Sequence, residues 1–199
     1  MPEVKVKFKC QNERILSAPV MINLELTSAC NVKCRHCYNF WRDDSDGPFD
    51  KMSKEKIDSL IQMMKEEKVF HVVLTGGEPF MNFDVLVYAL EEFSAAGIST
   101  SVNSNLMLAT PEKVLKLRNT GLDHVLTSLN SYIPEVNDYM FNRKGSFEKI
   151  IAGIKIAREA GIRISVNMII SETNKDHVYE TAKFCSELDA QRIFGTRLV

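Results

Sequence analysis

The sequence lacks the features that mark membrane, secreted and nucleic-acid-binding proteins. Its 199 residues contain no apolar run near the ~20 residues that a membrane-spanning helix needs. The N-terminal stretch MPEVKVKFKCQNERIL has no continuous apolar segment of the kind found in a secretory signal peptide. Neither sign of charge dominates, because 25 Lys and Arg residues stand against 26 Asp and Glu residues. We therefore expect a cytoplasmic protein with no membrane partner, and the lack of a basic excess argues against nucleic acid as a partner.

Extreme composition is also absent. Apolar residues make up 45% of the chain and charged residues 26%, and these globular values exclude disordered, collagen-like and coiled-coil chains. A chain of 199 residues is long enough to bury the core of one domain. We divide it into an N-terminal extension, residues 1–20, and a core domain, residues 21–199. Lysines alternate with apolar residues over Val4–Lys9, a pattern that allows a short edge strand in the extension.

From residue 21 onward, short apolar segments alternate with amphipathic ones. The predicted strands are Met21–Thr27, His71–Thr75, Ile98–Asn103, His124–Asn130, Arg163–Ile170 and Gln191–Val199. The predicted helices are Ser53–Lys68, Asn82–Ala96, Pro111–Asn119, Ser146–Ala160 and Asn174–Leu188. This alternation predicts an α/β fold in which right-handed crossovers join parallel strands.

The sequence allows two ways of arranging these strands. One is an open, doubly wound sheet, and the other is a curled, partly closed barrel. In both arrangements ligands bind at the carboxyl ends of the strands, so we expect the functional side chains there. The chain has no linker and no sequence repeat, and it stops directly after the sixth strand, which suggests a shortened or excised core.

Three of the five cysteines lie together directly after the first predicted strand. Cys30, Cys34 and Cys37 form the pattern C-x3-C-x2-C in the segment CNVKCRHC. In a cytoplasmic protein, thiols that converge from one short loop indicate a metal centre rather than disulfides. An iron–sulfur cluster with three cysteine ligands leaves one iron able to bind a small molecule. The alternatives are a zinc site completed by His36, or buried cysteines without a metal.

The remaining cysteines and histidines are expected to be structural. Cys10 and Cys185 stand alone, as ordinary core or surface thiols do. His71 and His124 begin predicted strands, at the end opposite to the cysteine loop. His177 lies on a predicted helix.

The segment CNVKCRHCY resembles the signature of the radical S-adenosylmethionine superfamily. The resemblance extends from Met21 to Val199 and implies a partial (β/α)6 TIM-like barrel of parallel strands with outer helices. It also implies that Cys30, Cys34 and Cys37 hold a [4Fe–4S] cluster, whose fourth iron binds S-adenosylmethionine. Members of this family cleave S-adenosylmethionine reductively to a 5′-deoxyadenosyl radical, which abstracts hydrogen from a substrate.

A second motif, Thr75-Gly76-Gly77-Glu78-Pro79, follows the second predicted strand. Two glycines allow a close approach of the backbone to a ligand, although a glycine turn before a helix is often plain structure. The motif resembles the GGEP element of the same family. By that resemblance, Gly76, Gly77, Glu78 and Pro79 contact the amino group of the methionine moiety.

Short polar side chains interrupt three further strands near their carboxyl ends. Asn105, Ser128 and Asn167 are the residues concerned, and by resemblance they hold the ribose, carboxylate or sulfonium end of the cofactor. Taken singly, each could equally satisfy the backbone of a turn. In the cysteine loop, the resemblance places a ring near the adenine, for which His36 and Tyr38 are candidates; Tyr38 could equally belong to the core.

Residues 137–147, NDYMFNRKGSF, resemble a family stretch that usually reads H-D-x-x-R-x-x-x-G-S-F. Asn137 stands at the position of the histidine and Phe141 at that of the arginine. In the family this arginine commonly binds the carboxylate of the cofactor. Arg143, two residues further along, is a candidate substitute, and a solvated surface arginine is the alternative.

The motifs together resemble the SPASM-type branch, which modifies peptides and proteins or matures cofactors. The implied partners are an electron donor, such as flavodoxin or ferredoxin, and a peptide or small-molecule substrate. Many members of that branch carry a cysteine-rich C-terminal domain, so this chain is either the core of a longer enzyme or a short variant. The alternatives are a non-catalytic zinc-binding α/β domain and a radical enzyme that acts on a nucleotide or tRNA.

Overall fold

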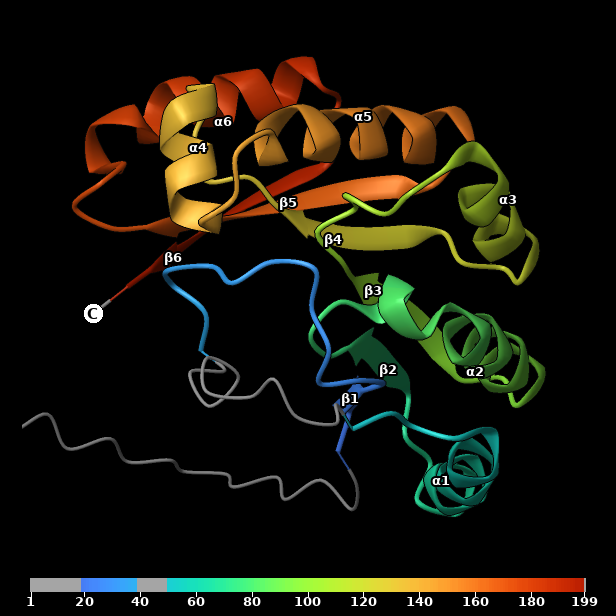
Figure 1. The fold of residues 1–199 in the computed structure, drawn as a ribbon. Coiled ribbons are helices and arrows are strands. Elements are labelled where there is room, and N and C mark those ends of the chain that lie inside the picture. The colour runs from blue at the N-terminus through green and yellow to red at the C-terminus, as the bar shows by residue number, and fades with distance from the viewer. Residues whose placement is uncertain (1–18, 39–49, 199) are drawn as a thin grey trace, which may run out of the picture.

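The computed structural model describes residues 19–38 and 50–198, which form one parallel sheet covered by helices (Figure 1). The strands are β1 (Met21–Glu25), β2 (His71–Thr75), β3 (Ser99–Asn103), β4 (His124–Ser128), β5 (Arg163–Ile170) and β6 (Arg192–Arg197). The helices are α1 (Lys54–Glu66), α2 (Phe83–Ala95), α3 (Pro111–Asn119), α4 (Pro134–Phe141), α5 (Ser146–Glu159) and α6 (Val178–Glu187). Two short 3-10 helices, η2 (Pro79–Asn82) and η3 (Lys175–His177), precede α2 and α6.

The order of the strands decides between the two predicted arrangements. The six strands are neighbours in chain order, from β1 to β6, and each neighbouring pair is parallel. A doubly wound sheet reverses this order at a switch point, whereas a barrel does not. Figure 1 shows the helices along one side of the curved sheet. Within the described residues β1 and β6 are not paired, so the predicted partial (β/α)6 barrel is confirmed.

Alternation of side chains along the strands gives the sheet two different faces. On the convex face, apolar residues such as Val72, Leu74 and Val102 are buried against the helices. The helices contribute apolar stripes to the same core, including Leu90 of α2 and Ile154 of α5. The opposite, concave face carries many short polar side chains. Parallel sheets are usually apolar on both faces, so a polar concave face indicates a surface for ligands.

Most predicted elements are present, with shorter bounds at some carboxyl ends. The first and fourth predicted strands end two residues early, at Glu25 and Ser128, because the chain turns there into loops of the carboxyl rim. Helix α4 was not predicted. It has only eight residues and no side-chain N-cap, so apart from Pro134 at its first position it carries few of the signals that mark a helix. The proposed strand in residues 1–20 and Cys10 lie outside the described residues.

Among the residues that the structure describes, no helix is both long and apolar enough to cross a membrane.

Helix α5 can approach the loop after β3 closely because it contains a glycine. A β-carbon on Gly153 would lie 2.3 Å from the carbonyl oxygen of Leu106, and both residues are buried. We expect Gly153→Ala to lower the free energy of unfolding by about 1–3 kcal/mol, which outweighs its gain in helix propensity. Urea denaturation measures the difference. Lys155→Ala on the exposed face of α5 is the control, and equal stability of the two variants would contradict the prediction.

Candidate functional site

A cavity of about 290 Å³ lies at the carboxyl ends of the strands. It is lined by eleven of the residues that the sequence predicted for a site, namely Cys30, Cys34, His36, Cys37, Tyr38, Gly76, Gly77, Glu78, Asn105, Ser128 and Asn167. Two predicted residues, Pro79 and Arg143, do not line it. Pro79 is buried at the start of η2, where it ends the glycine turn. Side chains from five different strand ends or loops therefore meet in one place.

The glycine turn after β2 holds the cysteine loop through its backbone. The amide of Gly77 donates to the carbonyl of Thr27 at 2.7 Å, and the amide of Glu78 donates to that of Ala29 at 2.8 Å. A β-carbon on Gly77 would lie 1.9 Å from the Ala29 oxygen, and one on Gly76 would lie 2.4 Å from the Thr27 oxygen. The two glycines thus permit a close contact between two loops, a role that the sequence alone did not show.

Glu78 joins the glycine turn to the loop that follows β3. Its carboxylate accepts hydrogen bonds from the amide of Phe80 at 3.1 Å, the hydroxyl of Ser104 at 2.7 Å and the amide of Asn105 at 2.8 Å. Only 1% of the residue is exposed, and burial raises the pKa of its carboxyl although the three hydrogen bonds oppose this. A cation bound at the cavity would favour the ionised form of this carboxyl.

Asn31, inside the cysteine loop, accepts hydrogen bonds from two side chains that are distant in the sequence. The side-chain amide of Asn105 donates to its Oδ1 at 2.7 Å. The guanidinium of Arg143 donates from Nη1 to its carbonyl oxygen. Sequence reasoning missed Asn31, although its position between Cys30 and Cys34 was a signal. Arg143 contacts the backbone of the cysteine loop, so it is neither a free surface arginine nor placed on the wall of the cavity.

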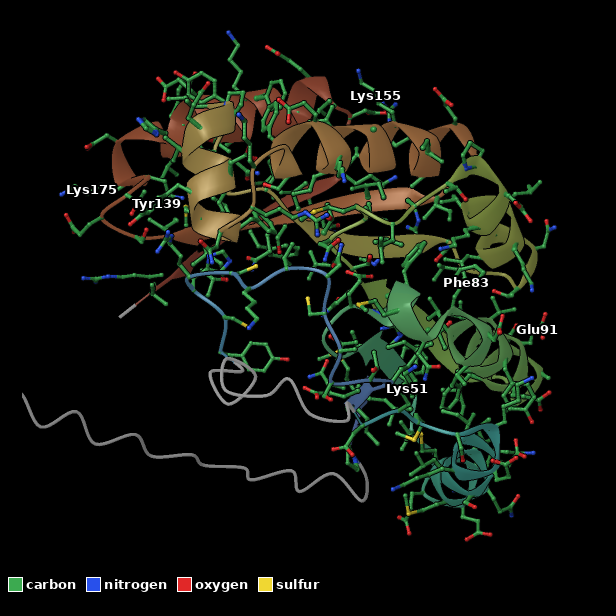
Figure 2. The ribbon with its side chains drawn as sticks, viewed as in Figure 1. Lys51, Phe83, Glu91, Tyr139, Lys155 and Lys175 are labelled. Atoms are coloured by element: carbon green, nitrogen blue, oxygen red, sulfur yellow. The ribbon has the colours of Figure 1, made fainter. Side chains whose placement is uncertain are left out.

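A further contact fixes the same loop to α4. The Nε of Arg35 donates to the carbonyl of Tyr139 at 3.0 Å, and its guanidinium lies 4.3 Å from the centre of the Tyr139 ring. Tyr139 lies on α4 near the cysteine loop (Figure 2). The amide of Arg35 also donates to the carbonyl of Met140. The unpredicted helix α4 is therefore part of the framework of the site.

The two ring candidates differ in their surroundings. His36 packs edge-on against Phe141, with ring centres 5.9 Å apart, and burial lowers the pKa of its imidazole. Phe141 thus has a packing role at the position where the family usually has an arginine. Tyr38 is 66% exposed and its hydroxyl donates to Glu25, so the alternative of a core tyrosine is wrong.

The segment from Asn137 to Phe147 comprises the second half of α4, the connecting turn and the first two residues of α5. The Asp138 carboxylate accepts from the hydroxyl of Ser146 at 2.7 Å and the amide of Phe147 at 2.8 Å. Asn137 is fully buried, and its Oδ1 accepts from the amide of Asn130 at 3.0 Å. These contacts fix the start of α5 and the end of β4. The aspartate and the Gly-Ser-Phe residues of this motif are structural here.

Ser128 and Asn167 are direct neighbours across β4 and β5. The hydroxyl of Thr196 on β6 donates to Asn167 Oδ1 at 2.9 Å, which orients the amide in the cavity. The strand ends of β4, β5 and β6 therefore present one continuous polar edge opposite the glycine turn.

We expect Arg143→Ala to loosen the cysteine loop. A hydrogen bond from a charged donor contributes ~1.5 kcal/mol or more, so the loop thiols of the metal-free protein should react about tenfold faster with a chromogenic disulfide reagent. The neighbouring Lys144 is exposed, and Lys144→Ala is the matched control. An unchanged rate in Arg143→Ala would show that its bond to Asn31 does not restrain the loop.

Comparison with known proteins places the whole arrangement in a family. The model of the Radical SAM superfamily matches residues 24–185. An AdoMet-dependent heme synthase of Methanosarcina barkeri is 30% identical over 174 residues, which are 87% of this chain and 49% of that protein. The mycofactocin maturase MftC of Mycolicibacterium smegmatis is 29% identical over 184 residues, 90% of this chain and 45% of that protein. The chain spans about half the length of these curated relatives.

A solved structure has the same fold. The crystal structure of Streptococcus suis SuiB bound to the precursor peptide SuiA superposes with a TM-score of 0.79 at 20% identity, covering 93% of this chain and 40% of SuiB. Because the family model matches residues 24–185, most of the length of this protein, the chain belongs to the radical SAM superfamily.

Proposed function

We propose that this chain is the core domain of a radical SAM enzyme that modifies a peptide or protein, or matures a cofactor. The observation that carries the proposal is one cavity lined by the three cysteines, the glycine turn and polar residues at or after β3, β4 and β5. The bound cluster and S-adenosylmethionine would supply a 5′-deoxyadenosyl radical for hydrogen abstraction.

The cysteines suit a cationic metal cluster. Cys30, Cys34 and Cys37 line the same cavity. Burial, followed by the charges of Cys30 and Cys37, raises the pKa of Cys34 to about 12. Three thiolates at one cavity are stable only beside a positively charged partner, which deprotonates the thiols that bind it.

The rival zinc site is less well supported. Within the described ranges, no three Cys, His, Asp or Glu side chains are close enough to share one metal ion. A zinc ion needs its ligand sulfurs about 2.3 Å from a single centre. His36 packs against Phe141, and among the described residues it forms no ligand set with the cysteines.

We assign the rest of the cavity to S-adenosylmethionine. Gly76, Gly77 and Glu78 would hold the α-ammonium, because a desolvated ammonium needs a carboxylate or several carbonyl groups beside it. Asn105, Ser128 and Asn167 would hold the ribose and the carboxylate, and His36 and Tyr38 would lie near the adenine. Pro79 ends the turn, and Arg143 positions the cysteine loop without contacting the cofactor.

The substrate class rests on the relatives. Bacillus subtilis AlbA, named for biosynthesis of the bacteriocin subtilosin, is 30% identical over 176 residues, 87% of this chain and 38% of that protein. Together with the maturase MftC and the heme synthase, it supports a peptide or a cofactor precursor. A probable GTP 3′,8-cyclase of Methanothermobacter marburgensis, 30% identical over 178 residues, makes a nucleotide the second candidate. The flavodoxin or ferredoxin donor and the cytoplasmic location stay predictions.

We predict that Cys30→Ala, Cys34→Ala and Cys37→Ala each abolish uptake of the cluster. The parent chain should bind about four irons and four sulfides after anaerobic reconstitution, because a cubane needs all three thiolates. Iron and sulfide analysis and absorbance near ~400 nm measure the uptake. Cys185 is buried away from the loop, so Cys185→Ala is the control and should keep the cluster. Stoichiometric zinc with no iron uptake in the parent would contradict the proposal.

We predict that Glu78→Gln weakens binding of S-adenosylmethionine by roughly 1.5–3 kcal/mol while the cluster remains, because one charge-assisted hydrogen bond is lost. Titration of the reconstituted chain, followed by electron paramagnetic resonance, measures the affinity.

Glu78 also joins the glycine turn to the loop after β3, a role called the clamp below. A second variant separates this role from direct binding of the cofactor. Ser104→Ala removes one donor to the same carboxylate but leaves its charge. If both variants weaken binding equally, the clamp is the cause. If neither does, Glu78 does not contact the cofactor.

A further inference from the structure

A second cavity, of about 610 Å³, lies on the concave face at the amino ends of the strands. All six strands contribute to its lining. Asn103 and Leu126 line both this cavity and the one at the carboxyl ends, so the two cavities meet at these residues. The concave face therefore forms one trough that runs from the cysteine loop to the opposite rim.

Histidine and serine side chains line this second cavity. The two ring nitrogens of His71 lie 3.0 Å and 2.9 Å from the hydroxyls of Ser99 and Ser101. Nε2 of His124 lies 2.9 Å from the hydroxyl of Ser165. In the neutral ring of His71 one nitrogen donates and the other accepts, so one of its two serines donates to the ring and the other keeps its proton for a ligand. These hydrogen bonds fix the two rings.

The charges at this rim are mainly positive. Arg163 pairs with Asp123 at 2.6 Å. Arg192 also lines the cavity, and it is in none of the ion pairs found among the residues that the structure describes. Burial lowers the pKa of His124, and the charge of Arg163 lowers it further. Asp123 raises this pKa, and Arg192 lowers it by a smaller amount. An anion bound here would relieve the repulsion between these groups.

We propose that the second cavity binds a carboxylate of the substrate, and that Arg192 is its charged contact. This inference rests on the proposed function, in which the reacting atom of the substrate lies at the first cavity. The strand register places Arg192 in the same row of the sheet as Asn103, where the two cavities meet.

The test uses nuclear magnetic resonance of the histidine rings in the reconstituted chain. The probes are glutarate, its uncharged analogue glutaramide, and inorganic phosphate. His71 and His124 lie at the strand ends opposite to the cysteine loop. A cluster bound by the cysteine loop should therefore leave their signals observable. His177, which does not line the cavity, is the internal reference.

We expect glutarate to shift the signals of His71 and His124 saturably and to leave that of His177 unchanged. Arg192→Gln should weaken this binding about tenfold, because a charged hydrogen bond is lost. Arg158, which pairs with Asp189 on the outer side, is the matched control, and Arg158→Gln should bind glutarate like the parent.

Three results would overturn the inference. They are equal shifts with glutaramide, an unchanged affinity in Arg192→Gln, and tighter binding of phosphate than of glutarate. The last result would favour the nucleotide candidate instead. The readout requires no cleavage of S-adenosylmethionine, so a chain that binds glutarate but takes up no iron would refute the proposed function alone.

Discussion

The arrangement of the site depends on the backbone contact between the glycine turn and the cysteine loop. Two hydrogen bonds, from Gly77 to Thr27 and from Glu78 to Ala29, fix the path of the chain just before the first cysteine. They form only because positions 76 and 77 carry no side chain, and any β-carbon on Gly77 would collide with the backbone of Ala29. The direction in which the three thiols leave β1 follows from this contact.

Other groups extend the same framework across the rim. Glu78 ties the glycine turn to the loop after β3, and Asn105 in that loop continues to Asn31 between the cysteines. Arg143 reaches Asn31 from the turn between α4 and α5. Because each of these groups also lies at or beside the cavity, the residues that shape the site and those proposed to bind the cofactor form one connected network.

One face of the sheet forms the apolar core, and the other face is available for a ligand. Along each strand, alternate residues pack against the helices and supply the buried apolar core. The residues between them, such as Asn103, Ser165 and Asn167, form a polar trough that the core does not need. The same two-residue period therefore provides stability on the convex side and leaves the concave side available for a ligand along its whole length.

The sequence by itself determined the alternation of strands and helices, the cysteine spacing and the glycine turn, because these depend on neighbours within a few residues. It predicted that polar strand ends would meet, since parallel strands end at one rim. The pattern of elements did not show α4, which has no side-chain N-cap. It also left the barrel and the doubly wound sheet open, and the resemblance to the radical SAM superfamily implied the barrel that the strand order confirms. Only the tertiary structure showed that Arg143 contacts Asn31 and that Phe141 packs against His36. These partners are about a hundred residues apart in the chain and come together only once the sheet has curled.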